Sequence, residues 1–340
     1  NRFLSERMVD FLGEINRIVR RETEGKKLTF AFYGYHYELV TFAHGYPASG
    51  NCALDRLIEK WKDEIDILAA PLCYSDRGWL GTSPVIGPAE TIRRNGILWL
   101  NEDDLRTHLG YEATGDGSFC CLRSARETRD AIRRTTLQEI VRGDAGWWMD
   151  HGAGWYDSQA EIWQPVRELA ALEERMVARR EPYVPEVALI VDEEMLLKLG
   201  DGSHTWAHPL INEGRFAVPR AGLSIGQYTA GDVRRRPLDA RTRRRLHLVP
   251  PGRETDLAAP LLRTADGAVD VSLAKISAPL VHSLAIRAGL KPRLKADEVG
   301  KAAVWSGSGI TAVQSLSEGF RDFNEGEVRF YDDSSSCELQ

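Results

Sequence analysis

Short apolar runs alternate with amphipathic stretches over the first half of the chain. Over residues 3–19, apolar residues recur at helical spacing, which predicts a first helix that covers another part of the protein. Buried strands alternating with helices are typical of parallel sheets, so the pattern that follows predicts four consecutive β/α units. The predicted strands are 28–32, 65–72, 97–100 and 146–149, and the predicted helices between them are 53–64, 89–94 and 124–142.

A second region follows a charged helix predicted at 161–180. The segment 181–185 contains two prolines and predicts a linker. A buried strand at 187–191 and helical stretches near 208–221, 238–246 and 280–288 predict a smaller doubly wound α/β domain. From residue 306, strands and turns or a loosely ordered tail are expected.

These patterns predict an α/β fold with two domains, 1–180 and 181–340. A complete eight-stranded β/α barrel takes roughly 250 residues. Four units therefore predict the C-terminal half of a (β/α)8 TIM barrel, followed by a Rossmann-like (flavodoxin-like) domain that carries a β-rich tail.

Composition narrows the function classes. The 340 residues are 43% hydrophobic and 28% charged, as in ordinary globular proteins. The net charge of -6 gives no global positive field for nucleic acid. The five cysteines form no CxxC pair, and no apolar run approaches the roughly 20 residues that cross a bilayer. We therefore expect no nucleic-acid partner, no membrane partner, no cofactor and no metal, and the cytoplasm is favoured without being decided.

Candidate chemistry lies at the ends of the predicted strands, because the loops after parallel barrel strands converge over one mouth. Carboxylates among aromatic residues suit a carbohydrate, whose apolar ring faces stack on indoles and whose hydroxyls bond to carboxylates and Arg. The candidates are Tyr35 after the first strand, Tyr74 and Arg77 after the second, Glu102, Asp103, Asp104 and Arg106 after the third, and Trp148, Asp150 and Trp155 after the fourth.

The acids at 102–104 are the most informative group. A solvated polar loop would also tolerate three consecutive acids. Arg106 favours a site, because its guanidinium can hold one carboxylate ionised and leave another free to attack. A retaining glycosidase needs such a nucleophile beside a protonated carboxyl about 5 Å away.

Segment 98–102 (LWLNE) resembles the seventh-strand segment of the family 42 glycoside hydrolases, the β-galactosidase family and its relatives. The continuation 103–108 (DDLRTH) looks like a string carried by a subgroup of those relatives. Segments 32–35, 71–77 and 146–150 agree in order with the ends of the fifth, sixth and eighth strands. Segment 185–194 is similar to the opening strand of the family's trimerisation domain.

The resemblance implies a retaining β-galactosidase-like hydrolase with Glu102 as nucleophile, acting on a glycoside or oligosaccharide and assembling as a homotrimer. Tyr35, Tyr74 and Arg77 would hold sugar hydroxyls, Arg106 and the neighbouring acids would position Glu102, and Trp148 and Trp155 would form the platform under the sugar. The family's acid/base, a Glu usually preceded by Asn at the end of the fourth strand, would lie before Asn1.

Two other interpretations stay open. The missing acid/base is compatible with a non-catalytic carbohydrate-binding or assembly fragment. The acids at 102–104 are also compatible with a divalent metal site in a barrel enzyme of another chemistry. The acids at 192–194 follow a predicted strand, where a nucleotide could bind, but no Gly-rich fingerprint follows them, so a structural or interface role is preferred.

Overall fold

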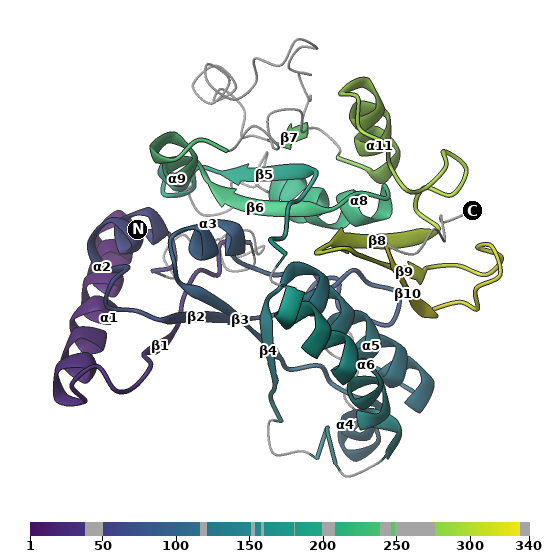
Figure 1. Ribbon diagram of the computed structural model, residues 1–340, viewed down its shortest axis with the longest axis horizontal. Helices are drawn as coiled ribbons and strands as arrows, with labels where there is room; N and C mark the ends of the chain where they lie inside the picture. The colour runs from purple at the N-terminus through teal and green to yellow at the C-terminus, as the bar shows by residue number, and fades with distance from the viewer. Residues whose placement is uncertain are drawn as a thin grey trace.

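The structure is a computed structural model, and within its described residues the chain is an α/β protein with three sheets (Figure 1). Two of the sheets are parallel and the third is antiparallel. The predicted α/β class is therefore confirmed. The described residues are 1–37, 50–115, 121–150, 154–157, 160–179, 181–198, 208–238, 246–248 and 276–333.

The first sheet contains four parallel strands that neighbour one another in chain order. They are β1 (Phe30–Phe32), β2 (Ile67–Pro71), β3 (Leu98–Asp103) and β4 (Ala145–Trp148). The four predicted strands are thus confirmed, with ends that move by a few residues. The accompanying helices are α1 (Arg2–Glu22), α2 (Leu54–Trp61), α3 (Ala89–Arg94), α4 (His108–Thr114), α5 (Ala125–Arg142) and α6 (Ala160–Arg179), of which α4 was not predicted.

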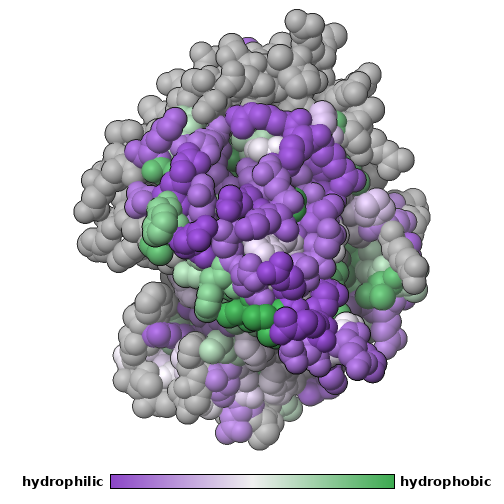
Figure 2. Space-filling view, turned by 90° about the vertical axis from the view of Figure 1, so that its left-hand side faces the viewer, coloured by the Kyte–Doolittle hydropathy of each residue, from purple (hydrophilic) through white to green (hydrophobic). Residues whose placement is uncertain are grey.

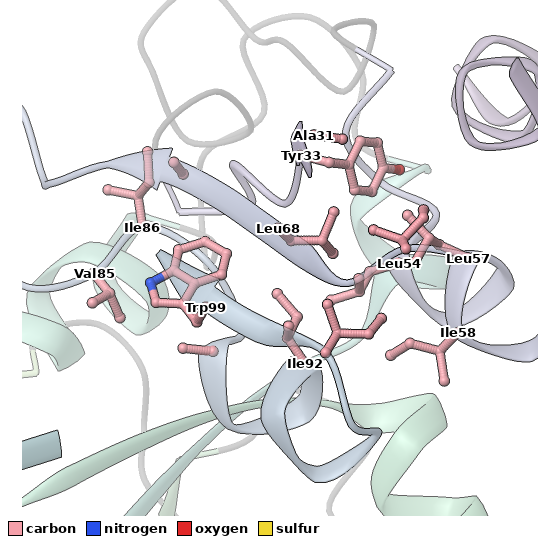
Figure 3. Packing of buried hydrophobic residues seen from close by; sticks show 14 of the residues in the cluster. Ala31, Tyr33, Leu54, Leu57, Ile58, Leu68, Val85, Ile86, Ile92 and Trp99 are labelled. Atoms are coloured by element: carbon pink, nitrogen blue, oxygen red, sulfur yellow. The ribbon is translucent and has the colours of Figure 1, made fainter. Parts of the chain in front are cut away.

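One face of this sheet is covered by α2 and α3 through an apolar core (Figure 3). Leu68 of β2 and Trp99 of β3 pack with Leu54 of α2 and Ile92 of α3, and each of the four is at most 1% exposed. Successive strand residues point to opposite faces. Burying a large apolar side chain contributes roughly 1.5–3 kcal/mol, so this layer fixes which face of β3 turns toward the helices.

The opposite face of the first sheet is open within the described part of the chain. Its large apolar residues are exposed: Phe30 by 43%, Phe32 by 40%, Leu98 by 60% and Trp147 by 38%. The rings of Phe32 and Trp147 lie 6.4 Å apart, although they belong to the two edge strands β1 and β4. Three flat strand spacings would separate the edges by roughly 14 Å. The open face is therefore concave.

Helix α1 has the predicted position but turns its apolar stripe outward. It packs on α2 through Gly13, which lies so close to the Trp61 indole that a Cβ would meet the ring at 2.0 Å. The predicted helix that covers another part of the protein is thus confirmed, since Val9 and Gly13 pack on α2, but most of its apolar stripe is exposed within the described residues. Figure 2, which views this end of the molecule, shows hydrophobic patches on a mostly hydrophilic surface. The exposed residues of the stripe are Phe3, Leu4, Met8, Phe11, Ile15, Ile18 and Val19.

The second sheet is parallel with the order β6-β5-β7. Strand β5 (Val187–Val191) lies where it was predicted, whereas β6 (Ile225–Thr229) had no counterpart among the predicted strands. The helix predicted to reach Leu246 is wrong there, because Leu246 begins β7 (Leu246–Leu248), and 239–245 lie outside the described residues. The other elements are α7 (Glu193–Leu196), the π-helix η3 (His208–Glu213), α8 (Gly214–Arg220), α9 (Ala230–Arg235) and α11 (Ala278–Arg287).

The C-terminal strands form the antiparallel third sheet, which confirms strands and turns rather than a loose tail over its residues. They are β8 (Ala302–Gly307), β9 (Ile310–Ser315) and β10 (Val328–Asp332). Trp305 and Ala312 pack against Leu137 and Ile140 of α5 and Leu169 of α6. The C-terminal sheet thus packs on helices of the first region.

A buried ionic network joins the two parallel sheets. The Arg142 guanidinium at the end of α5 donates to Glu90 of α3 at 2.7 Å, to Asp144 at 2.8 Å and to the carbonyl of Ile225 in β6 at 3.1 Å. The Tyr183 hydroxyl donates to the same Ile225 carbonyl at 2.8 Å. Because buried charges are tolerated only when they are paired, this network fixes one arrangement of the two sheets.

Candidate active site

Glu102 lies near the carboxyl end of β3, between neighbours on β2 and β4. Its register partners are Pro71 and Trp147. The two-residue period of the strand places Glu102 on the concave face with Leu98, and it places Asn101 on the helix-covered face with Trp99, whose indole donates to it at 2.7 Å. Glu102 is 6% exposed, so the carboxyl is mostly shielded from water.

An ion pair stands beside Glu102. Arg77, in the loop after β2, is buried, and its Nη1 pairs with the Asp104 carboxylate just beyond β3. The same guanidinium lies 4.7 Å from the centre of the Tyr74 ring. Tyr35, after β1, is half-buried, and the pKa of its hydroxyl is raised by burial first and then by Tyr74, Glu102 and Asp104 nearby. Loops after three adjacent strands therefore bring five of the ten predicted residues together.

Burial first, and then the negative charge of Asp104, raise the pKa of Glu102 to about 7, against the opposing effect of the Arg77 cation. A carboxyl with this pKa exists in both protonation states near neutral pH. It can therefore donate a proton below pH 7 and attack as a carboxylate above it.

The loop that carries Arg77 is fixed from behind by Arg134 of α5. Arg134 has no exposed surface, and its guanidinium donates to the carbonyls of Arg77 at 3.0 Å, Gly78 at 2.7 Å and Gly81 at 3.0 Å. Arg134 was not predicted from the sequence, because α5 contains several arginines and only the fold shows which of them are buried.

The structure does not bring Asp103 to this group. Asp103 has no exposed surface and shares the helix-covered face with Asn101. The Tyr156 hydroxyl donates to the Asp103 carbonyl at 2.8 Å, and burial raises the pKa of the Asp103 carboxyl well above its usual range. Asp103 was expected to contact a substrate, but it lies in the interior behind the site instead.

Arg106 and Trp155 form a separate pair. The Arg106 guanidinium lies 5.5 Å from the centre of the Trp155 ring. Trp155 is only 7% exposed and packs so closely on Gly110 that a Cβ there would meet the indole at 2.6 Å. Trp155 is thus a packing residue rather than an open sugar platform. The role expected of Arg106 stays a prediction, and Arg77 is an ion-pair partner of Asp104.

Trp148 ends β4 and is half-buried in an aromatic cluster with Tyr156 at 5.6 Å and Trp163 at 5.9 Å between ring centres. Trp163, on α6, was not among the predicted residues. Asp150 lies two residues beyond β4 and is exposed, and its participation in a site stays a prediction.

A cavity of about 890 Å³ lies beside strands β3 and β4. Leu98 and Ala145, at the starts of these strands, line it together with Tyr183 of the linker and residues of α5 and α6. Trp148, at the end of β4, also lines it, whereas Glu102 does not.

The described residues contain no group of three or more His, Cys, Asp or Glu side chains arranged to hold a metal ion, so the metal interpretation gains no support. Within the same residues, no helix combines the length and apolar character needed to cross a bilayer.

Comparison with known proteins gives no match, either to a protein-family model or to a curated protein. The resemblance to the family 42 glycoside hydrolases therefore stays a prediction that rests on the sequence segments described above.

Proposed function

We propose that this chain carries the nucleophile of a retaining, β-galactosidase-like glycoside hydrolase and that Glu102 is that nucleophile. The observation that carries the proposal is the grouping of Glu102 with the Arg77–Asp104 pair and two tyrosines at the carboxyl ends of adjacent parallel strands. Such strand ends are where β/α barrels hold their reactive groups.

The proposed step is a displacement at the anomeric carbon. The Glu102 carboxylate bonds to that carbon while the bond to the leaving oxygen breaks, and the electron pair departs with the leaving group. Water then hydrolyses the glycosyl ester and restores the carboxylate. Tyr35 and Tyr74 would bond to sugar hydroxyls, and Tyr35 stays a protonated donor because its pKa is raised.

We also propose that the four-stranded sheet is the C-terminal half of a (β/α)8 barrel. The proposal is supported by four parallel strands in chain order, by the concave face and by the exposure of Phe30 and Leu98 on it. The other half would supply the acid/base across the mouth. The order β6-β5-β7 supports a Rossmann-like second domain, and a homotrimer is the assembly that the family resemblance implies.

A non-catalytic carbohydrate-binding role is the second candidate. It is favoured by the low exposure of Glu102 and by a pKa of about 7, which leaves part of its population protonated at neutral pH. A protonated carboxyl binds sugar hydroxyls but does not attack.

Hydrolysis of dinitrophenyl glycosides tests the proposal, because this leaving group needs no protonation and the assay reads the nucleophile alone. Glu102→Gln keeps the shape and removes the charge, and we expect kcat/KM to fall at least about 10³-fold. Glu22→Gln, at the exposed end of α1, is the matched control. Undiminished hydrolysis by Glu102→Gln would refute the nucleophile. Sugar binding without turnover by the unmodified chain would instead favour the binding role.

A further inference from the structure

Two loops of the candidate site are attached to the part of the chain that forms the second sheet. Tyr35 is followed by His36, and Arg77 is preceded by Asp76. Each of these neighbours bonds to a charged residue from an element that follows or flanks β5 and β6. The first and second parallel sheets thus meet at the site loops as well as at Arg142.

The first attachment is a buried pair of His36 and Glu193. His36 Nε2 lies 2.6 Å from Glu193 Oε1, and both side chains are buried. Glu193 is the first residue of α7, and it also accepts the backbone N–H groups of Leu54 at 2.7 Å and Asp55 at 2.9 Å at the start of α2. A helix start favours negative charge and leaves N–H groups unpaired, so this carboxylate holds both α2 and the loop after β1.

The second attachment is bidentate. Arg220, the last residue of α8, donates to the two oxygens of Asp76 at 2.9 and 3.0 Å. Oδ2 of Asp76 also accepts the N–H of Thr82 at 2.9 Å. One carboxylate therefore ties both ends of the 76–82 loop to α8, and bidentate Arg–carboxylate pairs are among the stronger polar contacts in proteins.

We propose that Glu193 and Arg220 are positioning residues, which hold the loops carrying Tyr35 and Arg77 in place around Glu102. The second α/β unit is then part of the site's framework and not only an assembly module. For Glu193, the structural role expected of the acids at 192–194 is to bond to His36 and to the start of α2. The proposal rests on the proposed glycosidase function, and displacement of a binding group by about 1 Å can cost about 100-fold in rate.

Hydrogen–deuterium exchange tests the attachments without reference to activity. We expect faster exchange over 72–83 in Arg220→Met and over 33–37 and 54–57 in Glu193→Gln. The matched controls are Arg293→Met and Glu186→Gln, which break a 2.8 Å ion pair at the start of β5 and should leave those peptides unchanged. Arg220→Lys keeps the charge without the bidentate geometry and should exchange at an intermediate rate, which separates loosening of the loop from general unfolding.

For the same variants, kcat and KM are also measured with a dinitrophenyl glycoside. A hydrogen bond to a charged group contributes about 1.5–3 kcal/mol, which corresponds to a fall in kcat/KM of about 10- to 100-fold when the bond is lost. We expect the fall mainly as a higher KM. Loop exchange that matches the controls would overturn the proposal, as would KM values at the level of the controls. If the unmodified chain hydrolyses no glycoside, the proposed function fails, while loop exchange still decides whether Glu193 and Arg220 hold the loops.

Discussion

Replacing Asp104 with Asn removes a negative charge beside Glu102 and keeps the side-chain shape. Glu102 and Asp104 are alternate residues along the β3 direction, about 6.6 Å apart at their Cα atoms for an extended strand. Two unit charges at that distance interact by about 2.5 kcal/mol at an effective dielectric constant of about 20. About 1.36 kcal/mol corresponds to one pKa unit, and the Arg77 cation that pairs with Asp104 offsets part of its charge. We therefore expect the pKa of Glu102 to fall by about one.

The direction in which the pH profile moves follows from the chemistry of the nucleophile. Glu102 attacks only when ionised, so the acid limb of kcat/KM against pH reports its pKa, which is about 7 in the unmodified chain. Asp104→Asn moves that limb to lower pH. Arg77→Gln removes the cation that lowers the pKa of Glu102 and moves the limb to higher pH.

The assay is the pH profile of dinitrophenyl glycoside hydrolysis. Asp66→Asn is the matched control, since Asp66 lies just before the start of β2 and pairs with Arg20 at 2.9 Å, at the opposite end of the sheet from Glu102. Its profile should keep the acid limb of the unmodified chain. Limbs that move in the same direction in Asp104→Asn and Arg77→Gln, or that do not move, would refute the electrostatic account of Glu102.

Three further variants test the framework. Arg134→Met leaves three carbonyls of the Arg77 loop without their donor, and urea unfolding should show a loss of about 3 kcal/mol in the free energy of unfolding. A loss below about 1 kcal/mol would contradict the role of Arg134 in fixing this loop. Gly81→Ala places a Cβ 2.2 Å from the Asp76 carbonyl oxygen, so thermal unfolding should report about 2 kcal/mol of destabilisation, and an unchanged Tm would show that the loop yields freely. Asp10 pairs with Arg56 and Lys60, which hold the pKa of its carboxyl below its usual range. Because a depressed pKa stabilises the fold above the unfolded value, Asp10→Asn should cost about 1 kcal/mol at pH 7. The difference should begin to shrink below about pH 4 and disappear only as the pH falls through the lower pKa of the folded state, which denaturation across this pH range would check.

The first sheet was predictable because its strands are continuous apolar runs bounded by Gly and Pro. Strand β3 shows the limit of that signal. The apolar run ends at Leu100, yet the strand continues through Asn101, Glu102 and Asp103. Because the strand continues, its two-residue period places Glu102 on the concave face and Asp103 in the interior. From the sequence, residues 101–104 were expected to form a loop, and a loop gives no such period to tell the two acids apart.

Strand β6 was missed for a related reason. Its sequence IGQYT has Gly and Gln in the middle, and all five residues are buried. Gln227 is tolerated there because its Nε2 donates to the Val85 carbonyl at 3.1 Å, a contact between residues far apart in the chain. Local hydropathy does not encode such a partner.

The ion pair between Asp104 and Arg77 was not predicted. Arg77 was expected to hold a sugar hydroxyl, but its guanidinium pairs with the Asp104 carboxylate of the next loop. Loops after adjacent parallel strands meet in space, so cross-loop pairs compete with neighbours along the chain. Helix α1 shows a different limit. Its helical period predicted the helix, but the period does not tell whether the apolar stripe is buried or exposed.

The most direct measurement is identification of the residue that forms the glycosyl ester. A dinitrophenyl 2-deoxy-2-fluoro-glycoside loses dinitrophenolate on attack, and its fluorine slows hydrolysis of the ester, so the adduct can be mapped by peptide mass spectrometry. We expect time-dependent labelling of Glu102 in the unmodified chain and none in Glu102→Gln. A label on Asp104 or on any other carboxylate, or hydrolysis of the substrate with no covalent label, would contradict it.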